Sequence, residues 1–185
     1  MNLDSDRSGQ ASALTVIAPI APGAEADLRR YLEGLRATGS PLARLPRTHF
    51  GRWVIVADFT PDDERKPDHL AVPYLLFTAC FDGALDSYLD DLCDELAAEA
   101  PAIWGRCTGA PEPPTGAALK AYLRAHQAKT GFFVAAYPQA TVGHVRAALK
   151  QREDVIAFAR AAQGMDADAF ARAWRDFITD VQSCL

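Results

Sequence analysis

The stretches His49–Phe59 (HFGRWVIVADF) and Tyr74–Phe81 (YLLFTACF) decide the fold. Both are rich in β-branched and aromatic residues, which favour strands over helices. Side chains alternate along a strand, so Arg52 is expected on one face of the first stretch, and His49 and Trp53 on the other. The sequence therefore predicts two neighbouring strands, joined by a charged, proline-containing loop, that pair antiparallel.

The segments on either side of this pair complete a recognisable order of elements. A strand is predicted at Ala13–Pro19 and a helix at Ala24–Arg36. A second helix follows the pair, with its apolar stripe formed by Leu85, Tyr88, Leu89, Leu92 and Leu96, and Asp82 is a candidate for its N-cap. Ile103–Cys107 is predicted as a short fourth strand. The order is the ferredoxin-like βαββαβ core, an α+β fold with an antiparallel sheet and both helices on one face.

The rest of the chain is predicted to be rich in helix. After a proline-rich break, we expect a helix at Ala117–Gln127, a strand at Gly131–Tyr137, a helix beginning at Thr141 and a last helix at Asp168–Val181. The chain is thus divided into a flexible tail (1–12), a ferredoxin-like domain (13–111) and an α-rich extension (112–185) that packs on the same core.

Composition excludes several classes of function. Of the 185 residues, 49% are hydrophobic and 23% are charged, as in ordinary globular proteins. No apolar run approaches the roughly 20 residues that span a bilayer, and the polar start Met1–Ser12 does not resemble a signal peptide. The net charge of -5 argues against nucleic-acid binding. We therefore expect a cytoplasmic protein with reduced thiols at Cys80, Cys93, Cys107 and Cys184.

The candidate catalytic residues lie on the two central strands, because no standard catalytic motif occurs. Arg52 sits between apolar residues and needs a partner, either a ligand carboxylate or an acidic side chain of the protein. His49 and Trp53 share the opposite face. Asp82 ends a strand, where it can reach a cavity or serve only as a helix cap. Tyr88 joins them as a candidate lining residue of an apolar cavity.

Two further histidines are candidate ligands. His126 ends a predicted helix, where it can serve as an axial haem ligand or general base, or simply interact with the helix dipole. His144 lies in a first helical turn, where the dipole lowers its pKa and favours a neutral ligand or base. An exposed polar role is the alternative for His144.

The strands that contain RTHFGRWVIV and YLLFTACFDG resemble those of the dimeric α+β barrel superfamily. That superfamily includes dye-decolourising peroxidases, chlorite dismutase-like haem proteins and small monooxygenases. The peroxidases carry a G-x-x-D-G motif whose aspartate works with an arginine above haem iron. The matching stretch here is Ala79–Gly83 (ACFDG), with alanine at the first position. The resemblance implies a haem-dependent, peroxidase-like oxidoreductase with Arg52, His49 and Asp82 catalytic, and His126 or His144 holding the haem, with His126 as the iron ligand.

The resemblance also implies a homodimer, in which the partner covers the open face of the sheet. Two other functions remain open. One is a cofactor-free monooxygenase, cyclase or isomerase, whose small organic substrate would contact Trp53 and Tyr88. The other is a non-catalytic binding or assembly module. The aromatic stripe Phe170, Trp174 and Phe177 is expected to be core or a dimer contact.

Overall fold

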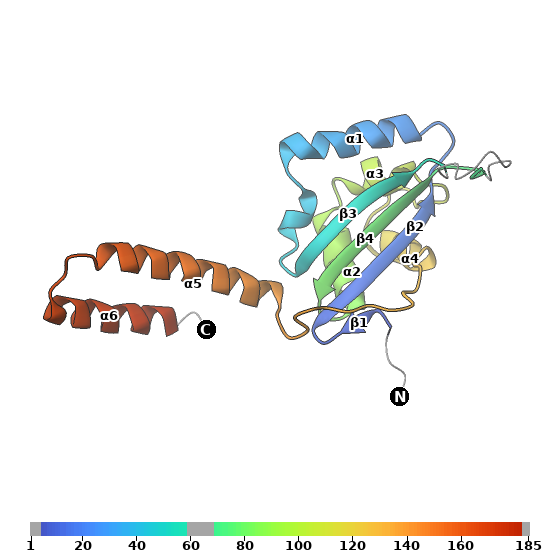
Figure 1. Cartoon of the computed structure of the whole chain (residues 1–185). Helices are drawn as coiled ribbons and strands as arrows, with labels where there is room; N and C mark the ends of the chain where they lie inside the picture. The colour runs from blue at the N-terminus through green and yellow to red at the C-terminus, as the bar shows by residue number, and fades with distance from the viewer. Residues whose placement is uncertain (1–4, 59–68, 183–185) are drawn as a thin grey trace, which may run out of the picture. The chain divides into compact units, whose positions relative to one another are not determined.

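The computed structural model describes residues 5–58 and 69–182, and Figure 1 shows the course of the chain. The chain divides into two compact units, residues 1–139 and residues 140–185. The first contains the sheet and four helices, and the second contains two helices. Each unit is described by itself below. No helix in the described part of the chain is both long and apolar enough to cross a membrane.

The first unit is built on a four-stranded antiparallel sheet. Its strands are β1 (Arg7–Ser8), β2 (Ala11–Pro19), β3 (Thr48–Val56) and β4 (Tyr74–Asp82), in the spatial order β1-β2-β4-β3. The α+β class and the antiparallel pairing of the two deciding stretches are confirmed. Among the described residues β3 pairs only with β4, so it lies at one edge of the sheet.

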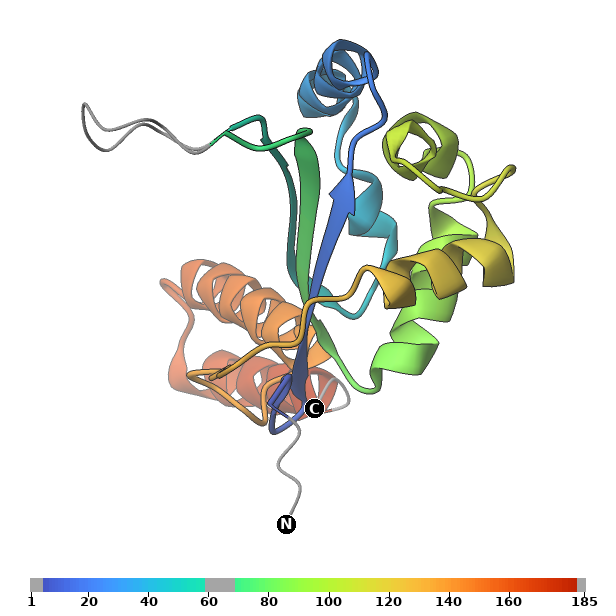
Figure 2. The same ribbon diagram turned by 90° about the vertical axis from the view of Figure 1, so that its right-hand side faces the viewer.

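The two faces of the sheet differ in burial. Along β4, Leu75, Phe77 and Phe81 are almost completely buried, whereas Leu76 and Thr78 between them are only partly covered. The buried face packs against α1 (Glu25–Thr38), α2 (Leu85–Glu95), α3 (Ala100–Ile103) and α4 (Gly116–Ala125), which lie on the same side of the sheet in Figure 2. Hence the helices cover one face of the sheet and leave the other more open.

Aromatic side chains fill the centre of this unit. Phe81 stacks on Tyr88 of α2 with ring centroids 3.8 Å apart. Trp104 is fully buried and meets Phe77 edge to face at 5.6 Å. The apolar stripe predicted for α2 therefore faces the sheet, and burial of these side chains in contact with one another supplies most of the favourable free energy of folding.

The prediction of a strand at Ile103–Cys107 is wrong. These residues end α3 and form the 3-10 turn η2 (Trp104–Arg106), and Cys107 adds one isolated bridge to Ile20. Proline is tolerated in the first turn of a helix, so Pro101, the second residue of α3, does not prevent this helix. The predicted N-cap Asp82 is also wrong, because Asp82 belongs to β4 and Ala84 precedes α2.

The predicted strand Gly131–Tyr137 does not form either. Phe132 in this segment is 82% exposed, and the segment has no ladder partner among the described residues. The available edge of β2 is already occupied: the Ile17 N–H donates to the His126 carbonyl, and the Ala128 N–H donates to the Thr15 carbonyl. Residues 126–128 and β1 thus cover this edge before residue 131 is reached.

The N-terminal residues expected as a tail contribute to the sheet from Arg7 onward. β1 and β2 form a hairpin whose two-residue loop is Gly9–Gln10. Gly9 has a φ of 64°, a conformation that favours glycine in such turns. The Gln10 N–H donates to the carbonyl of Pro138, so the last part of the first unit lies beside its first part.

The second unit is a helical hairpin of α5 (Val142–Ala161) and α6 (Ala167–Gln182). The predicted start of this helix at Thr141 is confirmed: Thr141 is the N-cap of α5, and its side chain accepts a hydrogen bond from the His144 N–H at 3.1 Å. The turn between the helices contains Gly164, which has a φ of 83°. Phe158 of α5 packs against three aromatic residues of α6, Phe170, Trp174 and Phe177.

Candidate functional site: a groove at the open edge of the sheet

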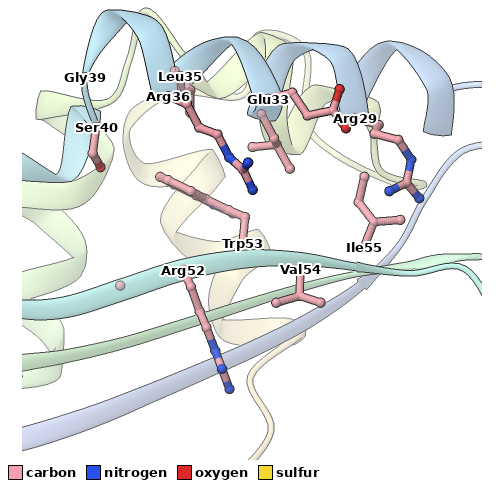
Figure 3. Close-up of a pocket in the computed structure, with 12 residues that line it drawn as sticks. Arg29, Glu33, Leu35, Arg36, Gly39, Ser40, Arg52, Trp53, Val54 and Ile55 are labelled. Atoms are coloured by element: carbon pink, nitrogen blue, oxygen red, sulfur yellow. The ribbon is translucent and has the colours of Figure 1, made fainter.

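The edge strand β3 and helix α1 enclose a groove of about 700 Å³ (Figure 3). α1 follows β2 and runs at the β3 side of the sheet, but among the described residues only Leu28 of this helix is buried. α1 is therefore held at a distance from β3, and the space between them stays open. A second hollow of about 800 Å³ lies at the start of the same helix and shares Arg29 and Glu33 with the first.

The floor of the groove is the β3 edge itself. Nine residues of β3, Thr48 to Val56, run along it. In an antiparallel strand every second residue directs its N–H and C=O away from its partner strand. In the part of the chain that the structure describes, β3 has no second strand partner, so these outward groups face the groove or solvent.

The walls of the groove combine apolar and basic side chains. Leu32 and Leu35 of α1 and Trp53 and Ile55 of β3 supply the apolar part. The basic part consists of Arg29, Arg36 and Arg52, and the lining contains one acidic residue, Glu33. The groove is thus net positive, although the whole chain is net negative.

The arginines differ in how they are held. Arg29 donates to Glu25 of its own helix at 2.7 Å, and the Arg52 Nε donates to the Thr78 hydroxyl at 3.2 Å. Arg36 has no ion-pair partner within residues 5–58 and 69–182. In Figure 3 its guanidinium reaches from α1 toward Trp53, whereas Arg52 points away from α1. Arg36 is therefore the cation best placed to bind an anionic group in the groove.

Trp53 is fixed at the inner end of the groove by aromatic contacts. Its ring stacks on Phe77 at 5.3 Å and meets Trp104 at 6.2 Å. The Trp53 indole N–H is shielded from solvent and has no hydrogen-bond partner among the described residues. The opposite faces predicted for Arg52 and Trp53 are confirmed, because Trp53 lies opposite buried Phe77 and Arg52 lies opposite Thr78 on the other face.

His49 and Asp82, both candidate catalytic residues, lie in contact. The His49 Nε2 is 2.8 Å from Oδ1 of Asp82, and both side chains are largely buried. His49 occupies a bulge between Thr48 and Phe50, which turns its ring toward the end of β4. A histidine held by a carboxylate can exchange protons with a bound molecule. This pair does not line the groove.

The other candidate residues are dispersed. Tyr88 is completely buried between α2 and the sheet, and its hydroxyl shares a 3.0 Å hydrogen bond with Thr48. Burial raises the pKa of the Tyr88 hydroxyl above its usual value. Arg52 and Trp53 line the groove, but on opposite faces of β3. The structure therefore does not bring His49, Arg52, Trp53 and Tyr88 around one cavity.

The two candidate haem ligands have structural partners and belong to different units of the chain. The His126 Nδ1–H donates to the Tyr122 carbonyl at 2.9 Å, and the two rings lie 4.2 Å apart. The His144 Nδ1 accepts from the Thr141 N–H at 3.4 Å within the capping box. Within the described segments, no three His, Cys, Asp or Glu side chains form a group that could hold a metal ion.

The thiols of the sheet unit are protected by burial. Burial raises the pKa of Cys107 to about 12 and that of Cys93 to about 11, and it also raises the pKa of Cys80. A raised pKa leaves the thiol protonated and unreactive at neutral pH. These cysteines therefore serve as small packing residues, and Cys184 lies outside the described residues.

Sequence reasoning missed the residues that α1 contributes to the groove, Leu32, Leu35 and Arg36. No signal in the sequence distinguished these residues from the apolar stripe and the last-turn arginine of an ordinary amphipathic helix. No family model matches the chain, and no curated protein or solved structure matches it.

Proposed function

We propose that this chain is a binding module that accepts an extended peptide segment as an additional strand along β3. The observation that carries the proposal is a nine-residue edge strand that faces a groove of about 700 Å³ under α1. An extended segment that pairs with an exposed sheet edge gains main-chain hydrogen bonds, and pockets for alternate side chains provide specificity. Both elements of this recognition mode occur here on one surface.

The groove also indicates the chemistry of the peptide. Alternate side chains of an added strand would point toward Leu32, Leu35 and Trp53 on the helix side of β3. Apolar side chains fit these positions. The unpaired Arg36 and the neighbouring arginines favour a carboxylate near the Arg36 end of the groove. We therefore propose an acidic peptide with apolar residues at every second position.

We also infer that β2, α1, β3, β4 and α2 form a ferredoxin-like core that lacks its final strand. Two features support this inference: the sequence of these five elements and the antiparallel order β2-β4-β3. In such a core the final strand lies beside the first, which here is β2, and this edge is covered by β1 and by residues 126–128. The peptide-binding proposal therefore rests on the β3 edge and the groove, and not on the missing strand.

The haem-dependent oxidoreductase and the cofactor-free enzyme remain predictions. The first rests on the resemblance of the two strands to the dimeric α+β barrel superfamily. The second would need a cavity lined by His49, Arg52, Trp53 and Tyr88, and of these residues only Arg52 and Trp53 line the groove. The absorption spectrum of freshly purified protein tests the haem prediction directly, and the peptide-binding proposal predicts no dependence on a Soret-absorbing cofactor.

The proposal is tested by panning a displayed library of random peptides, each about as long as β3, on the immobilised full-length protein. We expect enriched sequences to contain a carboxylate and alternating apolar residues. A fluorescein-labelled copy of an enriched peptide is then titrated in fluorescence polarisation. Amide hydrogen exchange of the complex should show added protection in Thr48–Val56, and the amides of β2 should not change.

Arg36→Glu and Arg30→Glu form a matched pair on one helix. Arg30 is exposed on α1, pairs with Asp27 at 2.9 Å and is not among the groove-lining residues. We expect Arg36→Glu to weaken binding of the acidic peptide about tenfold, and Arg30→Glu to change it less than about twofold. The proposal fails if no sequence is enriched, or if the selected peptide protects amides elsewhere and both variants bind it equally.

A further inference from the structure

The groove beside β3 is closed at the end where the chain passes from α1 into β3. After α1 the chain turns at Ser40 into a short 3-10 helix, η1 (Pro41–Arg44), and then enters β3. Leu42 of η1 is buried against Gly51, since a Cβ atom at Gly51 would lie only 2.5 Å from the Leu42 Cδ1. The space on the helix side of β3 is thus already filled at Gly51, and the groove ends there.

The backbone of β3 becomes irregular at the same end. Its register with β4 shifts between Thr48 and Phe50, where His49 occupies the bulge. A bulge disrupts the ladder and can terminate pairing. The regular edge therefore runs from Phe50 to Val56. A segment that pairs along this edge loses both its hydrogen-bonding pattern and its pocket near Phe50.

Ion pairs to α2 and to the segment after it hold the closed end in place. Arg44 of η1 lies 2.9 Å from the Glu99 carboxylate and donates to the Glu95 carbonyl at 2.6 Å. Arg47, just before β3, forms an ion pair with Asp91 of α2. Because these contacts exist before a ligand arrives, little ordering of the closed end is needed when a ligand binds.

Two side chains at the closed end can donate hydrogen bonds and have no acceptor among the described residues. The Ser40 oxygen accepts the Leu42 N–H at 3.3 Å, which leaves the Ser40 O–H available to donate. Arg36 is the unpaired cation of the groove lining, and Figure 3 shows it with Ser40 toward the Gly39 end. The end of α1 carries a partial negative charge of about half an elementary charge, which the full charge of Arg36 outweighs.

The acidic residue of the lining lies farther from the closed end. Glu33 precedes Arg36 by one turn of α1, and Arg29, one turn earlier still, is paired with Glu25. Positive charge is therefore concentrated where the groove ends and is balanced along the rest of it. One carboxylate at the closed end fits this distribution, whereas a second carboxylate beside Glu33 would be repelled.

We propose that the segment bound along β3 is the C-terminal end of a polypeptide, with its α-carboxylate held by Arg36 and Ser40. The inference rests on the peptide-binding proposal and specifies which carboxylate the groove takes. An internal segment would have to leave the groove at Gly51, whereas a chain terminus ends there. Because its carboxylate lies at the Gly51 end and its other residues extend toward Val56, the bound segment runs antiparallel to β3. Antiparallel pairing is the slightly more stable arrangement of two strands.

The test compares one peptide with and without a free C-terminus. Two libraries are panned on the immobilised full-length protein, one with free C-termini and one with a fixed Gly-Ser extension after the random residues. An enriched peptide is then labelled with fluorescein at its N-terminus, prepared as the free acid and as the C-terminal amide, and titrated by fluorescence polarisation. We expect enrichment from the first library, and binding of the free acid at least about tenfold tighter than that of the amide.

Variants assign the preference to the closed end. In Arg36→Gln the ratio of acid to amide affinity should fall below about twofold, and in Ser40→Ala it should fall by a smaller factor. Arg30→Gln, the matched control on the outer side of α1, should keep the wild-type ratio. A nitroxide at the peptide N-terminus should broaden the amide signal of Val56 more than that of Phe50.

The outcomes separate this inference from the proposed function. If acid and amide bind equally while both protect the β3 amides, the α-carboxylate inference is overturned and the peptide-binding proposal stands. Stronger broadening at Phe50 than at Val56 overturns the antiparallel direction, and with it the inference. If neither library yields a peptide that protects β3, both proposals are overturned.

Discussion

Trp104 and Trp174 show how differently the two units treat the same side chain. Trp104 has no exposed surface, and it meets Phe77 and Trp53 between the sheet and its helices. Trp174 has three ring neighbours, Phe158, Phe170 and Phe177, yet 44% of its surface is exposed. The difference in exposure arises from the number of packed layers around each ring. A sheet and the helices on it surround a ring, whereas two helices cover only one of its sides.

The comparison distinguishes apolar residues that stabilise the folded monomer from apolar residues that are available for association. In the sheet unit the apolar residues already contribute to folding of one chain, so their removal should destabilise the monomer. In the hairpin the exposed residues can contribute fully only when a partner covers them. The following experiments test this separation, beginning with the largest expected effect.

The same substitution at both tryptophans should have unequal effects on folding. We expect Trp104→Ala to lower the free energy of unfolding by about 3–5 kcal/mol, because it removes a completely buried aromatic side chain. Trp174→Ala should cost the monomer about half as much or less, since 44% of its surface stays in water. Urea unfolding at low protein concentration, followed by circular dichroism, measures both. Equal losses would show that the hairpin has a core of its own.

Alkaline pH should weaken the sheet unit through its buried thiols. Burial raises the pKa of Cys107 from the usual 9.0 to about 12, so the folded state holds this proton more tightly than the unfolded state. The resulting stability is complete below pH 9 and is lost as the pH rises toward 12. At about 1.4 kcal/mol per pH unit, roughly 2 kcal/mol should be lost by about pH 10.5.

Unfolding in urea at several pH values measures this loss. Cys107→Ala should lower stability at neutral pH but should flatten the alkaline slope, and Cys93→Ala should act in the same direction because its pKa is raised to about 11. An unchanged slope in both variants would contradict the buried-thiol explanation.

The smallest effect is expected from two tyrosine hydroxyl groups. Tyr88 is buried and shares a 3.0 Å hydrogen bond with Thr48, whereas Tyr137 is 80% exposed. We expect Tyr88→Phe to cost about 1 kcal/mol, because it removes one buried hydrogen bond and leaves Thr48 without that partner. Tyr137→Phe should have no measurable effect. Thermal unfolding of the two variants beside the wild type decides the matter, and equal shifts would be inconsistent with the packing described for Tyr88.

The sequence predicted the structure correctly where the local pattern and the tertiary packing favour the same outcome. Alternation along Thr48–Val56 correctly separated Arg52 from Trp53, and the apolar stripe of α2 correctly faced the sheet. The sequence-based prediction failed where a tertiary contact overrode the local pattern. Gly131–Tyr137 has the composition of a strand, but residues 126–128 already occupy the edge that it would need.

The candidate site was less accessible to sequence analysis. His49 and Asp82 were selected separately, and their contact depends on a bulge that shows no clear signal in the sequence. The groove depends on the distance at which α1 lies from β3, which follows from packing at Leu28 and not from any motif. Arg36 therefore looked like an ordinary residue of a helix end, favourable to the helix dipole.

The unequal edges of the sheet have a consequence for growth of larger assemblies. In the described parts of the chain no strand covers the outer side of β3, whereas the outer side of β2 is covered by β1 and by residues 126–128. A sheet with one available edge can be extended once in each molecule and offers no second edge for the next molecule. Edge-to-edge pairing of native molecules therefore ends at a closed pair or at a single bound segment, and it does not propagate into a fibre.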